Sequence, residues 1–506
     1  MEYQWAACTW HNAHRSVSFL LLSCILCVTM LRYRHKLNGW TSLLMFCAFS
    51  TIMGLAIPMG YGIGVINTPA DVIRAWCNET LQANYNIVLT DKKDLDLIWS
   101  VIVSVFLLSG VVGSFVGGWL ANLIGRKGAM LVSCLLSTVA GFCFLSPLIV
   151  NRIELLFAGR VIVGLSAGLG TAVVPMYLLE IAPTKLQGSI ATFFSLGITI
   201  GVLLGQILGL NWLLGGETRW PYLLSAYILC VLFCLLTFPC LPESPKYLFS
   251  VKNERQSALQ ALSRLRGLPA DLLQSELDSK DTAENNFNNE EIQTWSVAQV
   301  LRTRSLLLPL ALVIALQGGQ QFAGINAVFF YSSDIFKSAG LDETSREYAV
   351  IGTGCVNLGV NVIAVFTLKY FTRRFLVLLS CYGTVFSLLL LTLCSHYMQT
   401  VSWLPNASIA VVMLYVFMYG VGLGPIPYFI GSELFAVGPR PIAMAFGSFA
   451  NWGGNFLVSL TFTTFFNYLA GYSFLIFAGS TIYHKLTVEI SPCIHSQTLT
   501  SDQNCR

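Results

Sequence analysis

The sequence predicts an all-α membrane protein of twelve spanning helices, arranged as two six-helix bundles. Of its 506 residues, 55% are hydrophobic and 11% are charged, whereas an average soluble protein is about 25% charged. Apolar runs of roughly 20 residues, the length that spans a bilayer as a helix, recur along the whole chain. A polar segment divides these runs into two groups of six. Period-two alternation does not recur, so strands are not expected.

The first bundle is predicted over residues 41–241 and the second over residues 301–483. Residues 242–300 between them are polar and charged, and they are predicted to form amphipathic helices in water. The apolar runs of the first bundle are 41–66, 97–121, 128–150, 155–177, 188–210 and 221–241. Those of the second are 305–331, 348–368, 375–397, 407–431, 441–466 and 471–483.

Both ends of the chain depart from this plan. Residues 1–40 form an extension whose apolar run, 17–31, is short for a span. This run is a thirteenth helix, an interfacial segment or an artefact of the gene model; it lacks the small-residue cleavage site of a signal peptide. The last run, 471–483, is also expected to be a short helix, and a polar tail follows it over residues 484–506.

The basic residues predict which ends of the helices face the cytoplasm. Residues 32–36 (RYRHK), residues 125–127 (GRK), the central polar segment, Arg373 and Arg374 all fall on one side by helix parity. An excess of Lys and Arg marks the cytoplasmic side. Two Asn-X-Ser/Thr sequons, at Asn78 and Asn406, fall on the opposite side, where both are predicted glycosylation sites.

Several classes of function are not expected from this composition. The net charge of +4 is spread among loops, which argues against a nucleic-acid partner. The 15 cysteines are scattered, and the Cys24-x-x-Cys27 pair has no second pair or histidine cluster to complete a metal site. No cofactor motif is recognised. The chain has no HExxH or Walker motif, so we do not expect an enzyme.

The two groups of runs share motifs at matching places. Gly125-Arg126-Lys127 separates the second run from the third, and Thr372-Arg373-Arg374 separates the eighth from the ninth. Glu180 follows the fourth run in PMYLLEIAP, and Glu433 follows the tenth in PYFIGSELF. Duplicated halves with a binding site at their interface are a transporter architecture. The alternative is that the basic loops merely set the topology, but this does not explain the matching acids.

These motifs resemble those of a known family. The segments GRK, PMYLLEIAP, PESPKYLF, QQFAGINAVFFYS and GPIPYFIGSELF, in this order, are similar to the sugar-porter branch of the major facilitator superfamily, and most of all to the animal facilitative glucose transporters. The resemblance covers about residues 40–480. It implies a twelve-helix major facilitator fold in which two bundles rock about a central sugar site.

Four amides in the seventh run are the strongest candidates for that site: Gln317, Gln320, Gln321 and Asn326. An amide without a partner in hydrocarbon costs several kcal/mol, so these side chains either join helices or face something polar. An amide offers a donor and an acceptor, as a sugar hydroxyl does. The three glutamines share one helical face. Asn326 does not, but a helix break at Gly324 would turn it inward.

The resemblance implies roles for further residues. Asn357, Asn451 and Asn455 match sugar-contacting amides, and Trp452 matches an aromatic residue near the sugar. Ser195 and Tyr428 stand where relatives have a site glutamine and a site tryptophan. The outer gate is expected at Phe329, Phe330 and Tyr331. The inner gate is expected to consist of ion pairs that form across the halves when the transporter faces outward, between Glu180, Glu433, Arg126, Arg373, Arg374 and Arg440.

The inner-gate motifs also differ from those of the relatives. Gln187 replaces an arginine after the fourth run, Lys246 replaces the arginine of PESPR, and Thr372 replaces the glycine of GRR. We hypothesise that fewer ion pairs close the inner gate and that the equilibrium therefore favours inward-facing forms.

The predicted function is passive transport of a hexose across the plasma membrane. The triplet Gln317-Gly318-Gly319 combines a glutamine typical of the glucose branch with glycines closer to the fructose branch, so the hexose is left open. A proton-coupled symporter needs an acid that titrates inside the membrane; Gly62 stands where proton-coupled relatives place one. A sugar sensor or a relative that does not cycle is the other alternative. The oligomeric state is left open.

Overall fold

The computed structural model describes residues 40–87, 92–183, 186–274, 276–277, 295–338, 340–397, 400–401, 403–435 and 439–490. The elements within these ranges are all helical, as predicted. The apolar run at residues 17–31 and the tail from residue 491 lie outside the described residues.

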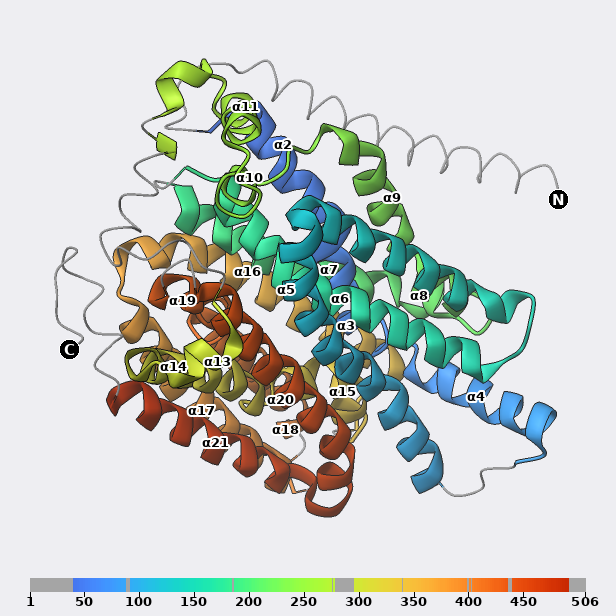
Figure 1. Ribbon diagram of the computed structural model, residues 1–506. Helices are drawn as coiled ribbons and strands as arrows, with labels where there is room; N and C mark the ends of the chain where they lie inside the picture. Colours follow the sequence, from blue (N-terminus) through green and yellow to red (C-terminus); the bar gives the residue numbers. More distant parts are fainter. Residues whose placement is uncertain are drawn as a thin grey trace.

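The N-terminal half of the described chain contains the six predicted segments (Figure 1). One amphipathic helix, α4, follows the first segment, and α5 contains both the second and third. The elements are α2 (Ser42–Thr51), the π-helix η1 (Ile52–Ala56), α3 (Ile57–Gly64), α4 (Ala70–Tyr85), α5 (Lys92–Leu145), α6 (Ile153–Ile181), α7 (Gln187–Leu208), α8 (Trp220–Ser225), α9 (Ile228–Thr237) and η5 (Phe238–Cys240). Pro58, which lacks a backbone donor, lies two residues after the π-helix that interrupts the first segment.

Short helices of the central segment lead to the C-terminal half. They are α10 (Pro245–Ser250), α11 (Arg255–Arg266), η6 (Ala270–Leu273) and α13 (Val297–Arg302). The second half then contains α14 (Arg304–Phe322), α15 (Ile325–Ser338), α16 (Glu343–Tyr370), α17 (Arg373–Tyr397), α18 (Leu404–Val421), α19 (Ile426–Leu434), α20 (Arg440–Leu469) and α21 (Ser473–Ile490).

Nine helices in the described ranges are long and apolar enough to cross a membrane. One of them, Asp94–Leu148, contains two predicted spans joined at a kink. The shorter apolar helix Thr192–Leu208 within α7 is a further span. The remaining predicted span, 441–466, is formed by α20, whose mean hydropathy is lowered by polar residues such as Asn451 and Asn455. The twelve predicted spans are therefore all helical.

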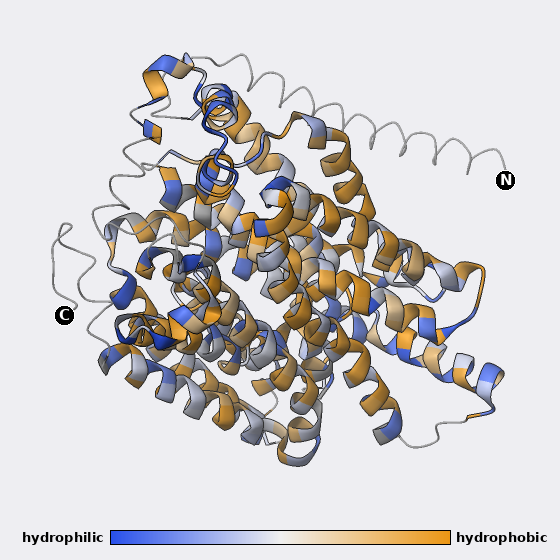
Figure 2. Ribbon diagram, viewed as in Figure 1, coloured by the Kyte–Doolittle hydropathy of each residue, from blue (hydrophilic) through white to orange (hydrophobic). Residues whose placement is uncertain are grey.

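The two halves lie side by side, and helices from both form the interface. Between the halves, α7 packs against α16 and α5 packs against α20. Figure 1 shows α10 and α11 at one end of the molecule, which we call the inner end, and α4 at the opposite, outer end. The basic residues predict that the inner end is cytoplasmic. Figure 2 shows hydrophobic residues along most of the helical length, as expected for helices surrounded by lipid.

Two elements differ from the prediction. Helix α4 was not predicted, because it is not an apolar run: it buries Ile73 and Cys77 on one face and exposes polar residues on the other. The last helix is longer than the run at 471–483, since α21 extends to Ile490. Its 18 residues rise about 27 Å. His484 is buried, and Lys485 pairs with Glu489 at 3.3 Å, which supports the added turns.

The bend within α5 depends on Gly125. Its φ of +87° and ψ of 169° lie in a region that is essentially restricted to glycine. The bend directs the backbone N–H groups of Arg126 and Lys127 to the Glu243 carboxylate, both at 3.1 Å. A Cβ at position 125 would lie 2.3 Å from Glu243 Oε2. Gly125 therefore allows the turn between the second and third spans to dock on the central segment.

We predict that Gly125→Ala destabilises the protein by about 1–3 kcal/mol, the cost of holding a non-glycine residue in this backbone region. The measurement is the apparent melting temperature of the purified protein in detergent. Gly118→Ala is the matched control, because Gly118 is on the same helix and an added Cβ there meets nothing within 4 Å. Equal melting temperatures for the two variants would contradict the role given to Gly125.

Candidate functional site

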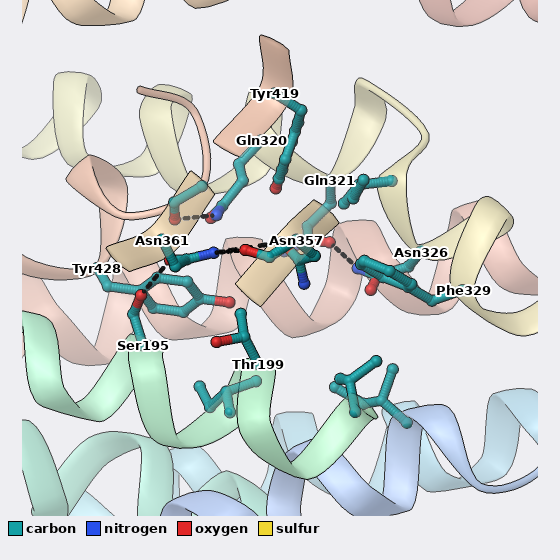
Figure 3. Close-up of a pocket in the computed structure, with 15 residues that line it drawn as sticks. Ser195, Thr199, Gln320, Gln321, Asn326, Phe329, Asn357, Asn361, Tyr419 and Tyr428 are labelled. Carbon is teal, nitrogen blue, oxygen red and sulfur yellow. Dashed lines mark hydrogen bonds between the residues drawn. The ribbon is translucent and has the colours of Figure 1, made fainter. Parts of the chain in front are cut away.

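A cavity of about 70 Å³ lies between the two halves. Figure 3 shows polar side chains from both halves facing it, and no ionisable carboxylate, Lys, Arg or His is among its lining residues. The N-terminal half contributes Ile63, Ser195, Ile198, Thr199 and Val202. The C-terminal half contributes Gln320, Gln321, Ile325, Asn326, Phe329, Asn357, Asn361, Tyr419, Gly424 and Tyr428.

The predicted break of the seventh span is present at Gly324. Helix α14 ends at Phe322, Gly324 has a φ of +91°, and α15 begins at Ile325. The Tyr415 hydroxyl donates to the carbonyl of Ala323 at 2.8 Å, so the break does not leave this buried group unpaired. The break turns Asn326 into the cavity, where its Nδ2 donates to Gln321 Oε1.

A second break, between α18 and α19, provides a partner for Gln320. The carbonyl of Gly424, which lies within this break, accepts a hydrogen bond from Gln320 Nε2 at 2.8 Å. On the other side, Gln320 Oε1 accepts from Asn451 Nδ2 at 2.9 Å. Asn451 also donates to Gln317 Oε1 at 3.0 Å. The Gln320 amide is therefore held between a broken helix and a side-chain network of α14 and α20.

Helices α7 and α16 bring polar groups of opposite halves into contact at the cavity. Ser195 Oγ donates to Asn361 Oδ1 at 2.8 Å across the interface. Asn361 Nδ2 in turn donates to the carbonyl of Asn357 at 2.9 Å. Asn361 and Thr199 were not predicted as site residues. Each lies four residues after a predicted one, Asn357 or Ser195, and this helical spacing could have identified both.

The structure separates the predicted site residues into two sets. Those that line the cavity are Gln320, Gln321, Asn326, Asn357, Ser195, Tyr428 and Phe329. Those that are buried but do not line it are Gln317, Asn451, Trp452, Asn455, Phe330 and Tyr331. Asn455 accepts from Ser459 Oγ at 3.3 Å, and Trp452 packs edge-on against Phe106 with ring centroids 5.7 Å apart. The Tyr331 hydroxyl donates to the carbonyl of Ser459.

At the outer end, two kinds of contact join α15 to the N-terminal half. Asn67, which follows α3, donates to Ser332 Oγ at 2.6 Å and accepts from the backbone N–H of Ser333 at 3.3 Å. Both bonds are buried or partly buried. Farther out, Asp71 on α4 pairs with Lys337 on α15 at 3.0 Å, and both side chains are more than half exposed. These contacts hold α15 against the N-terminal half.

At the inner end, each of the following bonds of the predicted gate residues joins two described residues of the same half. Arg126 donates two hydrogen bonds of 2.9 Å to Glu180 in the N-terminal half. In the C-terminal half, Arg373 pairs with Glu433 at 3.4 Å. Arg374 donates to the carbonyl of Glu489, and Arg440 to that of Phe435. These bonds do not tie the halves together. The outer end is closed in this conformation, and the pairing across the halves that is expected when the transporter faces outward stays a prediction.

The two sequons lie at the outer end of the molecule. Asn78 is on α4, and Asn406 is exposed in the first turn of α18. Their glycosylation stays a prediction.

Comparisons with known proteins agree with this arrangement. Residues 47–493 match the family model described as "Sugar (and other) transporter". The human facilitated glucose transporter member 3 of solute carrier family 2 is 38% identical over 421 residues, which cover 83% of each chain. Human member 14 is 37% identical and covers 83% of this chain and 79% of the relative. The proton:xylose symporter XylE of E. coli has a similar fold, with a TM-score of 0.73, 20% identity, and coverage of 88% of this chain and 95% of that one.

We predict that Asn67→Ala weakens the outer closure more than Lys337→Gln does. The Asn67 bonds are shielded, and each is worth about 0.5–1.5 kcal/mol, whereas an exposed ion pair contributes little. Hydrogen exchange of the α15 backbone amides measures the opening. Exchange should accelerate in Asn67→Ala and change little in Lys337→Gln. The reverse order would show that the ion pair, rather than the buried amide, holds α15.

We further predict that the Asp71–Lys337 contact of the outer closure does not change between pH 7 and pH 5. Burial raises the pKa of Asp71, but Lys337, Arg74 and Arg346 outweigh it, so the pKa lies below its usual value of 3.8. A lowered carboxylate pKa means that the pair is intact above about pH 4 and is lost only as the pH falls through the lowered value. Protection factors of the α15 amides measure this. A decrease between pH 7 and pH 5 would contradict the assignment.

Proposed function

The chain belongs to the sugar transporter family, and from this premise we propose that it carries hexoses passively across the plasma membrane by alternating access. It is a multi-pass membrane protein with the major facilitator fold. Relatives 36–38% identical to it are facilitated glucose transporters. Glucose and fructose are the candidate hexoses, and we propose transport rather than catalysis.

The observation that carries this proposal is a cavity between the halves that is lined by neutral amides. Asn326 and Gln321 both line it and bond to each other, and Gln320 bonds to a freed carbonyl. A hexose hydroxyl donates and accepts, so it is able to replace either partner in such bonds. Because the amides carry no charge, releasing them from one another to bind sugar does not require an ion to lose its partner.

Alternating access follows from where the bonds between the halves lie. At the outer end, Asn67 and Asp71 bond to α15 and close the path to the cavity. At the inner end, Arg126 with Glu180 and Arg373 with Glu433 stay within their halves. Each half therefore carries its inner ion pair as it rocks. We propose that opening to the outside breaks the α15 contacts and brings the inner ends of the halves together.

Passive transport is favoured over proton coupling by the surroundings of a buried arginine. Arg160 is 1% exposed, and it donates to the carbonyls of Gly62 and Ile102 at 3.1 and 3.2 Å. Its guanidinium also lies 4.6 Å from the centroid of the Phe106 ring. Main-chain carbonyls and a ring thus compensate this charge, and position 62 has no carboxylate that could exchange a proton with the outside.

A non-cycling sugar sensor is the second candidate. The observation that favours it is Gln187, which stands where relatives have a gate arginine and donates to the carbonyl of Leu179 on its own half. Such a protein would bind hexose without flux.

We predict that the reconstituted protein equilibrates labelled hexose across liposomes without accumulating it, at equal rates with and without an inward proton gradient. Uptake of labelled D-glucose and D-fructose measures this, with each unlabelled sugar as competitor. Accumulation driven by external acid would instead indicate a symporter. Saturable binding without flux would indicate the sensor.

The site is tested within the same assay by two matched amides. Asn326 lines the cavity and Asn455 does not. Asn326→Ala should raise the half-saturation constant about two- to tenfold, the range for losing one hydrogen bond between neutral groups, and Asn455→Ala should change it less. Equal effects would show that the cavity is not where the sugar is bound.

A further inference from the structure

The interface between α7 and α16 continues from the cavity to the outer end as two matching polar faces. On α7, the face contains Ser195, Thr199, Val202 and Gln206, which recur at helical spacing. On α16, the facing positions include Asn361, Asn357 and Gly354. Ser195 bonds Asn361 at the cavity, and the backbone N–H of Asn211 bonds Glu347 Oε1 at 3.1 Å at the far end. Gln206 lies between these two bonded levels.

Gln206 differs from the other amides of this interface because its side chain has no partner. It is 0% exposed, and neither its Nε2 nor its Oε1 has a hydrogen-bond partner among the described residues. It lies seven residues from Thr199 on the same helical face, about 10 Å farther along the axis. An unpaired buried amide destabilises the conformation that buries it. Its presence here therefore requires a reason beyond packing in the closed state.

The neighbouring helix leaves room for this amide. A Cβ at position 354 would lie 2.0 Å from Gln206 Oε1, so any residue larger than glycine would have to displace the side chain. Gly354 is on α16, three residues before the cavity residue Asn357. The Gln206 amide thus points across the interface towards the half that moves away when the outer end opens.

We propose that Gln206 is an outer subsite for the sugar: its amide bonds a hexose hydroxyl in the outward-open state, before the sugar reaches the cavity. This inference rests on the proposed function. When α7 and α16 separate, the amide becomes the first polar side chain of this α7 face on the path inward. It acquires from the sugar the partner that it lacks in the closed state. When the outer end closes, α16 returns to the amide and Gly354 again lies against it. No room is then left for the sugar hydroxyl beside the amide, so the sugar moves on to the cavity.

The test compares Gln206→Leu with the unaltered protein for a parent sugar and its monodeoxy derivatives, added on the outside. The parent is D-glucose, or D-fructose if that is the sugar transported. Gln206→Leu should raise the external half-saturation constant for the parent about two- to tenfold, the range for one hydrogen bond between neutral groups. For the derivative that lacks the contacted hydroxyl, the two proteins should have the same constant.

Three outcomes overturn the inference. Gln206→Leu has no effect, or it changes all sugars by one factor, which would indicate a shifted conformational equilibrium alone. If the unaltered protein takes up the sugar and Gln206→Leu gives either of these two results, this inference is overturned and the proposed function stands. No uptake by the unaltered protein overturns both.

Two further variants complete the experiment. Gln206→Met keeps the length of the side chain but removes the amide, and it should reproduce the hydroxyl-selective effect even if Gln206→Leu does not fold. An unchanged external constant for the parent sugar in folded Gln206→Met would overturn the subsite. Leu204→Ala is the control, because Leu204 is on the same helix but its side chain is 38% exposed and does not line the cavity. This variant should leave the selectivity among deoxy sugars unchanged.

Discussion

The structure depends on one constraint: an amide that is removed from water without a hydrogen-bond partner destabilises the conformation that buries it. The central amides meet it by bonding to one another and to carbonyls that helix breaks leave free. Gln320 uses the carbonyl of Gly424, and Asn326 uses Gln321. Partners of this kind are exchangeable, because a sugar hydroxyl offers the same donor and acceptor. The same constraint that stabilises the empty protein thus provides a binding site for a polyol.

The breaks also connect the site to the outer closure. Helix α15 begins at the Gly324 break, contributes Asn326 and Phe329 to the cavity, and bonds Asn67 through Ser332 and Ser333 farther along. A movement of this 14-residue helix therefore changes the site and the closure together. Gly324 is essential to this coupling, because its positive φ lets α15 leave the axis of α14. We therefore propose that sugar binding and outer gating are coupled through this helix.

Much of this could be predicted from the sequence, and the remainder has physical reasons. Apolar runs predict spanning helices well, because lipid forces backbone bonding within each segment. They do not predict α4, whose apolar face is only one side of a polar helix. Among the amides, a break at Gly324 predicted where Asn326 points. The sequence could not predict that Gln320 lines the cavity and Gln317 does not, because both lie on one helical face. The packing of α14 against α20 decides which of them reaches the cavity. Which partners the charged residues of the inner end choose depends on the conformation of the protein, and a sequence motif does not specify the conformation.

The central claim is that the amides exchange their mutual hydrogen bonds for bonds to a hexose between the two halves. A structure of the protein determined with bound hexose tests it most directly. The account predicts the sugar between α7 and the α14–α15 break, with Gln321 and Asn326 parted from each other and bonded to its hydroxyls. A sugar bound elsewhere, with the Gln321–Asn326 bond unchanged, would contradict it.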